Sequence, residues 1–289
     1  MPRAAIRNLT PPPELAKIRP GQSIELLKEL HILTRDGRMN QDSRRKLKQV
    51  YHLYQFIEPL LAQTVAAHGS ARMADIGAGK SYLGFILYDL FFKARDDASH
   101  VYGIEARSDL VQKSIALAQQ LQFTRMTFLD KPVADTAQAA ALPVTLDLVT
   151  ALHACDTATD DAIRLALQKQ ARFIVLAPCC QAEVATALRK HKGAALADTH
   201  TGALTEVWRH PLHTREFGSH ITNVLRCLQL EAHGYQVNVT ELVGWEHSLK
   251  NELIIASFKD LPRARAAGRL HELLEKLGLA ELKERFFAP

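Results

Sequence analysis

The stretch ADIGAGKSYLGFILYDL, residues 74–90, decides the fold of this chain. Its GAGKS segment matches the end of the phosphate-binding pattern G-x-x-x-x-G-K-[ST], in which the first glycine lets the backbone fold around phosphates. Here that first position is Ala74, and Asp75 would place a carboxylate beside the phosphates and repel them. Both residues therefore disfavour an ATP site.

The whole stretch fits a strand, a glycine turn and a helix. ARMAD, residues 71–75, is a short apolar strand that ends in an acid, and GAG, residues 77–79, is a tight turn. KSYLGFILYDLFFKA, residues 80–94, has the spacing of an amphipathic helix. Together they predict the first unit of a nucleoside-binding α/β domain.

A second acid follows at the expected distance. HVYGIEA, residues 100–106, predicts the next strand, and Glu105 at its end is placed to bind ribose hydroxyls. An acid before the glycines as well suits a ligand with an amino group, such as S-adenosylmethionine, whose methionine end Asp75 would face. Asp130, at the end of the third predicted strand, either bonds the adenine amino group or forms a turn. The remaining cofactor-binding candidates are Gly77, Ala78, Gly79, Lys80, Tyr82 and His153.

Length and composition are compatible with one large domain and flanking helices. The chain has 289 residues and a net charge of +5, which leans toward a polyanionic partner. Its four cysteines form neither a disulfide framework nor a C-x-x-C pair. No apolar run is long enough for a membrane span and no secretory segment is present, so we expect a cytoplasmic protein without a membrane partner.

The order of the predicted elements defines the fold class. Five strands alternate with helical patterns and predict a parallel sheet, whereas residues 234–258 predict two strands joined too closely to be parallel. We therefore predict an α/β, doubly wound, Rossmann-like sheet of seven strands with an antiparallel terminal hairpin. The predicted divisions are a disordered tail at 1–22, a helical extension at 23–69, the α/β domain at 70–259 and C-terminal helices at 260–289.

Three motifs carry a family resemblance. ADIGAGKSYLGFILYD, LDLVTALHACDTATDDAI and FIVLAPCCQ, in this order, resemble the class I methyltransferase domain of the eukaryotic tRNA acceptor-stem ribose 2'-O-methyltransferases and of related methyltransferase-like proteins. The resemblance covers residues 45–258 and implies S-adenosylmethionine binding. Gln181 stands where that family commonly has a His or similar residue, and the flanking zinc-finger modules are absent. The fold and the cofactor therefore transfer better than the substrate.

The loops after the fourth and fifth strands should face the site, because ligands bind at the carboxyl ends of parallel strands. Asp156 is a candidate to accept a proton or to hydrogen-bond the acceptor group. TATD, residues 157–160, matches a capping box, which makes Thr157 and Asp160 structural. Lys250, in the hairpin loop with Trp245, would contact a phosphate or the target oxygen, unless this loop is an ordinary polar turn.

The cysteines of the same loops leave an alternative open. Methylation at carbon 5 of a pyrimidine needs a thiolate that adds to the ring, and Cys155 and Cys179 lie on the two loops where such thiolates occur. A small thiol can equally pack behind a cofactor. The His and Cys spacings match no standard zinc site, so we predict no metal.

Basic clusters extend the prediction to a partner. They comprise Arg44-Arg45-Lys46 with Lys48, residues 189–192, and Arg209 with Arg215. Together they could follow a nucleic-acid backbone, although each alone is usually a solvated face. The sequence thus predicts a methyltransferase acting on RNA, with tRNA as one candidate, by direct transfer to oxygen or nitrogen. The alternatives are a small-molecule or protein methyltransferase, and a module that binds cofactor or RNA without catalysis.

Overall fold

A computed structural model provides the structure of the protein. It describes residues 17–152, 154, 156–178, 181–190, 206, 209–242 and 252–287. All structural statements below refer to these residues.

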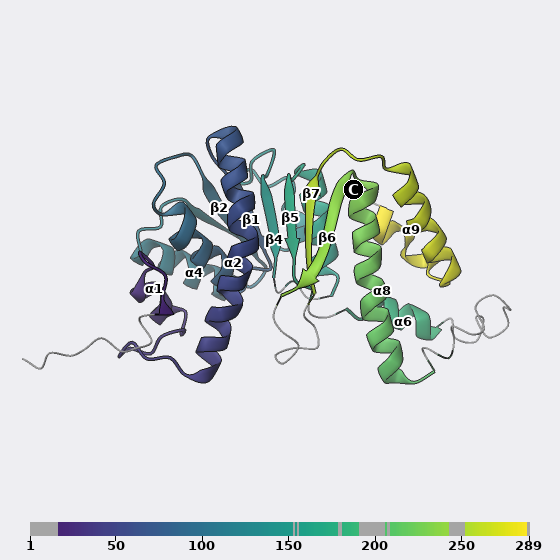
Figure 1. Cartoon of the computed structure of the whole chain (residues 1–289), viewed down its shortest axis with the longest axis horizontal. Helices are drawn as coiled ribbons and strands as arrows, with labels where there is room; N and C mark the ends of the chain where they lie inside the picture. Colours follow the sequence, from purple (N-terminus) through teal and green to yellow (C-terminus); the bar gives the residue numbers. More distant parts are fainter. Residues whose placement is uncertain are drawn as a thin grey trace, which may run out of the picture.

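A seven-stranded sheet forms the centre of the molecule (Figure 1), in the order β3-β2-β1-β4-β5-β7-β6. The first five strands run parallel, and β7 is antiparallel to both β5 and β6. This is the predicted fold class, and the antiparallel hairpin at one edge is confirmed. The strands are β1 Arg72–Ile76, β2 His100–Glu105, β3 Met126–Asp130, β4 Leu148–Ala151, β5 Phe173–Leu176, β6 Tyr235–Glu241 and β7 Glu252–Phe258.

Helices cover both faces of the sheet. Because successive side chains of a strand point to opposite faces, Met73 of β1 enters one apolar core and Ala74 enters the other. The core of Met73 includes residues of α1, α2, α3 and α4, whereas that of Ala74 includes residues of α5 and α8. The helices are α1 Ile24–Glu29, α2 Gln41–His68, α3 Tyr82–Leu87, α4 Ser108–Gln120, α5 Ala158–Gln168, α6 Glu183–Lys190, α8 Pro211–Ala232, α9 Ala264–Lys276 and α10 Lys283–Phe287.

The long helix α2 occupies most of the predicted helical extension and is amphipathic. Its apolar side chains at helical spacing are buried in the core that contains Met73: Leu47, Val50, Tyr54, Ile57 and Leu61. The side chain of Asn40 accepts the Ser43 N–H at 2.8 Å and caps the first turn. At the other end Gly69 takes a left-handed conformation that terminates the helix.

The helix predicted over residues 80–94 differs from its pattern. Helix α3 ends at Leu87 and continues as a π-helical turn, η2 Tyr88–Phe92, that is buried on nearly all sides. The face expected to meet solvent is covered by the N-terminal segment, from which the Ser23 N–H donates to the Asp89 carboxylate at 2.7 Å. Lys93 Nζ donates to the same carboxylate at 3.1 Å. The pattern therefore missed a contact between residues that are far apart in the sequence.

The C-terminal segment, predicted to be helical, forms the two α-helices α9 and α10. Helices α9 and α10 pack against α8 and α6 through a separate apolar cluster that contains Leu270, Leu274 and Phe286. Figure 1 shows this group at one end of the sheet, opposite α1 and α4. No described helix is both long and apolar enough to span a membrane.

Candidate functional site

The turn between β1 and α3 is held in a left-handed conformation. Gly77 and Gly79 have φ values of 61° and 58°, and Ser81 follows with 51°. A Cβ atom on Gly77 would lie 3.3 Å from the Cα of Ala154, so this turn packs directly against the loop after β4. Glycine is required here by both the backbone conformation and the close approach.

Amide groups of this turn are already bonded within the protein. The Ala78 N–H donates to the carbonyl of Ile104 at 3.0 Å, and the Ser81 N–H donates to the carbonyl of Ala78 at 2.6 Å. The Gly79 N–H donates to Glu105 Oε2 at 2.7 Å. A phosphate-binding loop needs such N–H groups directed at its ligand, so the turn is not built as a phosphate nest. The structure thus supports the argument against ATP.

Asp75 lies behind the turn and is buried at the end of β1. Its Oδ1 accepts the hydroxyl of Thr150 at 2.9 Å, and the N–H of Gly84 also bonds the carboxylate. Burial raises the pKa of Asp75 to about 6, although these two hydrogen bonds act in the opposite direction. This carboxyl group therefore changes its charge close to neutral pH.

Glu105 connects the end of β2 to the turn. Besides the Gly79 N–H, its carboxylate accepts the backbone N–H of Arg107 at 3.1 Å and the Arg107 side-chain Nε at 3.0 Å. Partial burial alone would raise the pKa of Glu105, but the bonds from Arg107 and Gly79 outweigh it and hold that pKa below its usual value. Glu105 is accordingly an ionised hydrogen-bond acceptor.

A cavity of about 250 Å³ opens over this turn. Sequence reasoning predicted six of its lining residues: Asp75, Gly77, Ala78, Gly79, Lys80 and Tyr82. It missed three others, namely Leu83, Arg107 and Leu152. Arg107 could have been found, because it follows the strand-end acid by two positions and can reach back to it. The two leucines gave no signal beyond core apolarity.

Two of the described cofactor candidates, Glu105 and Asp130, do not line this cavity. Glu105 is buried and bonds the Gly79 N–H of the turn, whereas Asp130 takes a different position. It ends β3 opposite Glu105 in the strand register, but it is exposed and does not line the cavity. The predicted bond between Asp130 and an adenine amino group stays a prediction.

On the acceptor side, Asp156 joins the loops after β4 and β5. Its Oδ1 accepts the Ala182 N–H at 3.0 Å, and its own backbone is left-handed with φ of 50°. The other candidates on this side, together with the hairpin tryptophan, lie outside the described residues: His153, Cys155, Cys179, Trp245 and Lys250.

The capping box predicted for residues 157–160 is wrong. Thr157 sits at the N-cap of α5 but makes no side-chain capping bond. Asp160 instead binds the buried guanidinium of Arg226, at 2.7 Å to Nε and 2.9 Å to Nη2. Burying the Arg226 guanidinium without a counter-charge would cost more free energy than leaving the first turn of α5 without a side-chain cap, so Asp160 pairs with Arg226. The predicted structural role of Asp160 holds with this different partner.

Residues 45–187 match the family model described as a methyltransferase domain. The sheet order and the glycine turn with its two acids agree with that match. The chain carries a class I methyltransferase domain. The family resemblance read from the three motifs is thereby confirmed at this level, while the relation to tRNA enzymes stays a prediction.

Several solved structures are similar to this methyltransferase domain. Magnesium protoporphyrin IX methyltransferase from Synechocystis PCC 6803, with bound SAH, is 17% identical over 81% of this chain and 94% of that one, with a TM-score of 0.43. A putative O-methyltransferase from Klebsiella pneumoniae is 14% identical over 85% and 94%, with a TM-score of 0.49. An rRNA methylase from Streptococcus thermophilus is 10% identical over 67% and 88%, with a TM-score of 0.36. A search of curated proteins finds no match.

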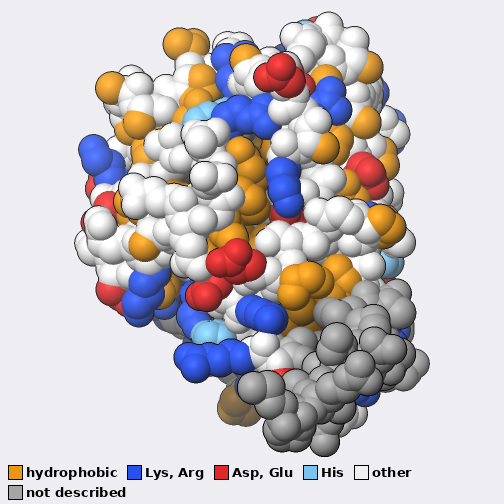
Figure 2. Space-filling view, turned by 90° about the vertical axis from the view of Figure 1, so that its left-hand side faces the viewer, with side chains coloured by type: hydrophobic (Ala, Val, Ile, Leu, Met, Phe, Trp, Pro, Cys, Tyr) orange, Lys and Arg blue, Asp and Glu red, His pale blue; other side chains and the backbone are white. Residues whose placement is uncertain are grey.

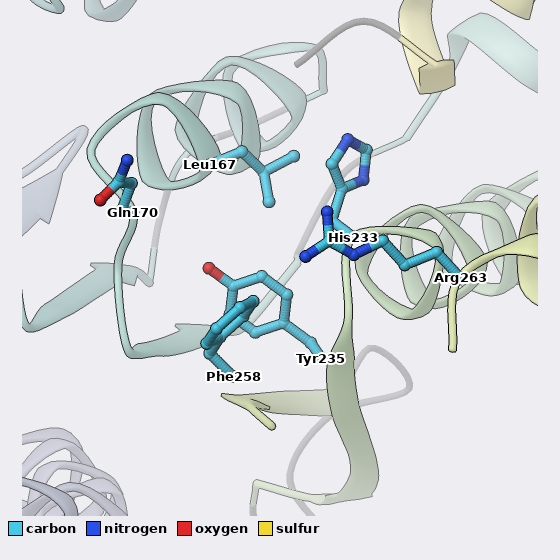
Figure 3. Close-up of a pocket in the computed structure, with 6 residues that line it drawn as sticks. All are labelled: Leu167, Gln170, His233, Tyr235, Phe258 and Arg263. Carbon is cyan, nitrogen blue, oxygen red and sulfur yellow. The ribbon is translucent and has the colours of Figure 1, made fainter. Parts of the chain in front are cut away.

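A larger cavity, of about 400 Å³, lies elsewhere in the described part of the protein (Figure 3). It is found where β5 and β6 begin and β7 ends, so it lies at the opposite edge of the sheet from the glycine turn. Its walls include the rings of Tyr235 and Phe258, whose centroids are 5.3 Å apart, and the guanidinium of Arg263 points into it. None of the predicted site residues lines it, so its size alone does not make it the functional site.

Proposed function

We propose that this chain is an S-adenosylmethionine-dependent methyltransferase that acts on RNA. The observation that carries the cofactor is the turn around Gly77 and Gly79, which has one acid behind it and a second acid bonded to its Gly79 amide, with other amide groups of the turn also bonded within the protein. A neutral ribose and a cationic methionine end suit such a site, whereas a polyphosphate does not.

The residues at the cavity and beside it would divide the binding between them. Glu105, which is bonded to the Gly79 amide next to the cavity, is an ionised acceptor and would take the ribose hydroxyls. Asp75 would set the electrostatic environment of the methionine end through the turn. Tyr82, Leu83 and Leu152 line the same cavity and would exclude water from the nucleoside. The fit therefore combines two carboxylates with an apolar wall.

The chemistry asked of the chain is mainly orientation. S-adenosylmethionine supplies a methyl group on a sulfonium, which is already electrophilic, so holding the acceptor in line contributes most to the rate. We retain Asp156 as the candidate for receiving the acceptor proton and Lys250 for contacting a phosphate or the target oxygen. Cys155 and Cys179 are retained for the alternative route through a thiolate.

The RNA part of the proposal is supported by where basic side chains lie. The first turns of α2 and α8 extend past the sheet at the edge where β1 to β5 end (Figure 1). Exposed cations occur at both ends, among them Lys46 and Lys48 on α2 and Arg215 on α8. Their exposed ion pairs, such as Arg215 with Glu216, withdraw little of this charge from a polyanion. These two helix ends would flank an RNA strand at the site.

The face that carries α1 and α4 is a poorer choice for RNA. Among the coloured residues of Figure 2, lysine and arginine side chains form separate groups with acidic and apolar side chains between them. A nucleic-acid backbone is followed best by a continuous basic strip, which this face lacks among its coloured residues.

We assign residues 70–259 as the catalytic unit. Helix α2 of the 23–69 extension would be its RNA-binding arm, and residues 260–289 would support the C-terminal side of the fold.

The test is transfer of a labelled methyl group from S-adenosylmethionine to separated RNA, protein and metabolite fractions. The proposal expects label in RNA and transfer that weakens with added salt, because phosphate contacts release counterions. K46E/K48E should lower RNA transfer about tenfold or more, as each lost phosphate contact adds to the loss. The matched control K276E/K283E reverses two charges in the C-terminal helices and should leave transfer unchanged. Label only in metabolites or protein would overturn the RNA assignment.

A further inference from the structure

Arg226 of α8 is the largest fully buried side chain in the described part of the protein. Its Nε and Nη2 donate to the two carboxylate oxygens of Asp160 at 2.7 and 2.9 Å. Nη2 also donates to the backbone carbonyl of Asp156 at 2.9 Å. A single guanidinium thus binds both the start of α5 and the loop that follows β4.

Asn223, one turn before Arg226, extends this network. Its Oδ1 accepts Arg226 Nη1 at 3.2 Å and Gln181 Nε2 at 2.9 Å. Its Nδ2 donates to Glu252 Oε2 at 2.7 Å. Gln181 in turn accepts the hydroxyl of Ser219 at 2.7 Å. Both polar atoms of the Asn223 side chain are used, and two of its three bonds lead away from α8, to Gln181 and to Glu252.

The partners of α8 share one location in the fold. Asp156 lies in the loop after β4, Gln181 lies in the loop after β5, and Glu252 opens β7 after the hairpin. Since β4 and β5 are parallel and β7 runs antiparallel to β5, these three segments meet at the carboxyl edge of the sheet. That is the edge at which the acceptor must approach the cofactor.

Helix α8 is itself held rigidly. A Cβ atom on Gly218 would lie 2.6 Å from the Cβ of Ala185, so α8 and α6 are in backbone-close contact. The apolar cluster with α9 and α10 packs on the same helix. The network therefore connects the loops after β4 and β5 and the start of β7 to α8, a helix that is itself packed firmly against its neighbours.

Stability does not explain such an arrangement. Replacing a buried ion pair by apolar side chains of similar volume is often neutral or stabilising, whereas a fully satisfied polar network fixes one geometry. A site that works by orientation needs loops with one geometry. The cofactor cavity is lined by Asp75, the glycine turn and the start of α3, together with Arg107 after β2 and Leu152 directly after β4. None of these lining residues is a member of the network.

We propose that Arg226, Asn223 and Gln181 are positioning residues, which hold the loops after β4 and β5 and the start of β7 in the geometry needed for methyl transfer. This proposal rests on the proposed function. It predicts a split between the two halves of the site: disturbing the network lowers the transfer rate and leaves cofactor affinity nearly intact.

The test variant is Gln181→Leu, with Gln229→Leu as its matched control. Gln229 lies on α8, is 1% exposed and has an unpartnered side-chain oxygen, so Q229L makes the same chemical change outside the network. Q181L is expected to lower kcat about tenfold or more while the Kd of S-adenosylmethionine stays within about threefold, because orientation and not binding is lost. Q181H should keep most of the rate, because imidazole can donate to Asn223 and accept from Ser219.

A second measurement does not depend on activity. The Ala182 N–H donates a hydrogen bond to Asp156 Oδ1. Hydrogen exchange at this amide should become faster in Q181L and stay unchanged in Q229L. Equal kcat in Q181L and Q229L, or a loss of cofactor affinity parallel to the loss of kcat, would overturn the positioning role. If the wild-type protein transferred no methyl group, the proposed function would fail, and unchanged exchange in Q181L would show separately that the network does not hold these loops.

Discussion

The carboxylate of Glu105 and the amide of Gly79 are 2.7 Å apart, so the acid that ends β2 closes the turn that follows β1. One side chain thereby performs two tasks. It fixes the turn in the free protein, and it places an ionised acceptor next to the turn that lines the cavity. The site therefore depends on the pairing of β1 with β2, because the turn after β1 is fixed by the acid at the end of β2.

We expect Glu105→Gln to weaken S-adenosylmethionine binding while the protein stays folded. Glutamine keeps one oxygen for the Gly79 N–H but loses the charge and the second acceptor, and a charge-assisted hydrogen bond contributes about 1.5–3 kcal/mol. Calorimetry should therefore show an affinity about 10- to 100-fold lower. Asp109→Asn, an exposed acid in the first turn of α4 that pairs with Lys113, is the control and should bind as the wild type does. Equal affinity of the two variants would contradict the assignment of Glu105.

The buried Asp75 predicts a pH-dependent stability. Its pKa is about 6 in the folded protein against a reference value of 3.8, so the folded state holds the proton over a range in which the unfolded state has lost it. This favours folding below pH 3.8, and the advantage is lost as the pH rises through about 6. Asp75→Asn cannot ionise. Its stability relative to the wild type should therefore become more favourable by about 1 kcal/mol between pH 5 and pH 8.

Urea unfolding of both proteins at the two pH values measures this difference. The amide introduced by Asp75→Asn can keep the local bonds, since its oxygen can accept the Gly84 N–H and its NH2 group can donate to the Thr150 hydroxyl. The comparison cancels the titration of all other groups. A difference that stays constant from pH 5 to pH 8 would show that Asp75 does not titrate in this range.

Gly77→Ala should damage both the fold and the cavity. Alanine at φ of 61° costs about 1–2 kcal/mol, and its Cβ would press on the Cα of Ala154 at 3.3 Å. Distortion of the glycine turn, which itself lines the cavity, should lower cofactor affinity about tenfold or more, because 1.4 kcal/mol corresponds to a factor of ten. Gly268→Ala is the matched control, because that glycine lies inside α9 with open space around it. It should be neutral or stabilise the protein, so similar losses in both variants would argue against a special role of Gly77.

The sequence allowed the sheet to be predicted because its signals are local. A strand ending in Asp75, a glycine turn and a helical pattern identify one unit, and the short connection between β6 and β7 excludes a parallel pair. The cofactor half of the site follows from the same reasoning, since Asp75 and Glu105 end neighbouring parallel strands.

Contacts between distant residues limited the rest. The TATD segment matches a capping box because the local sequence contains only Thr157 and Asp160. In the structure Asp160 binds Arg226 instead, which follows 66 residues later in the sequence. In the same way Asp89 accepts a hydrogen bond from Ser23, which lies 66 residues before it. This contact belongs to the segment that covers the predicted amphipathic helix at residues 80–94, so that helix is buried on both sides. No periodicity encodes either contact, so the acceptor-side network emerged only from the three-dimensional structure.

The Asp160–Arg226 pair should be intolerant of single substitutions. Asp160→Asn would leave the guanidinium buried without its counter-charge, because the Arg226 and Asp160 side chains are only 1% and 3% exposed. Removing one partner of such a pair costs about 3–5 kcal/mol, whereas an exposed pair contributes about 0–1 kcal/mol. Asp260→Asn breaks the exposed pair with Arg263 and keeps a residue that tolerates φ of 50°, so it is the matched control. Chemical denaturation should place D160N several kcal/mol below D260N, at about 3–5 kcal/mol of lost stability. The double variant D160L/R226L should recover much of that loss, since it removes both charges, yet it should not recover methyl transfer, because the loops would lose their common support.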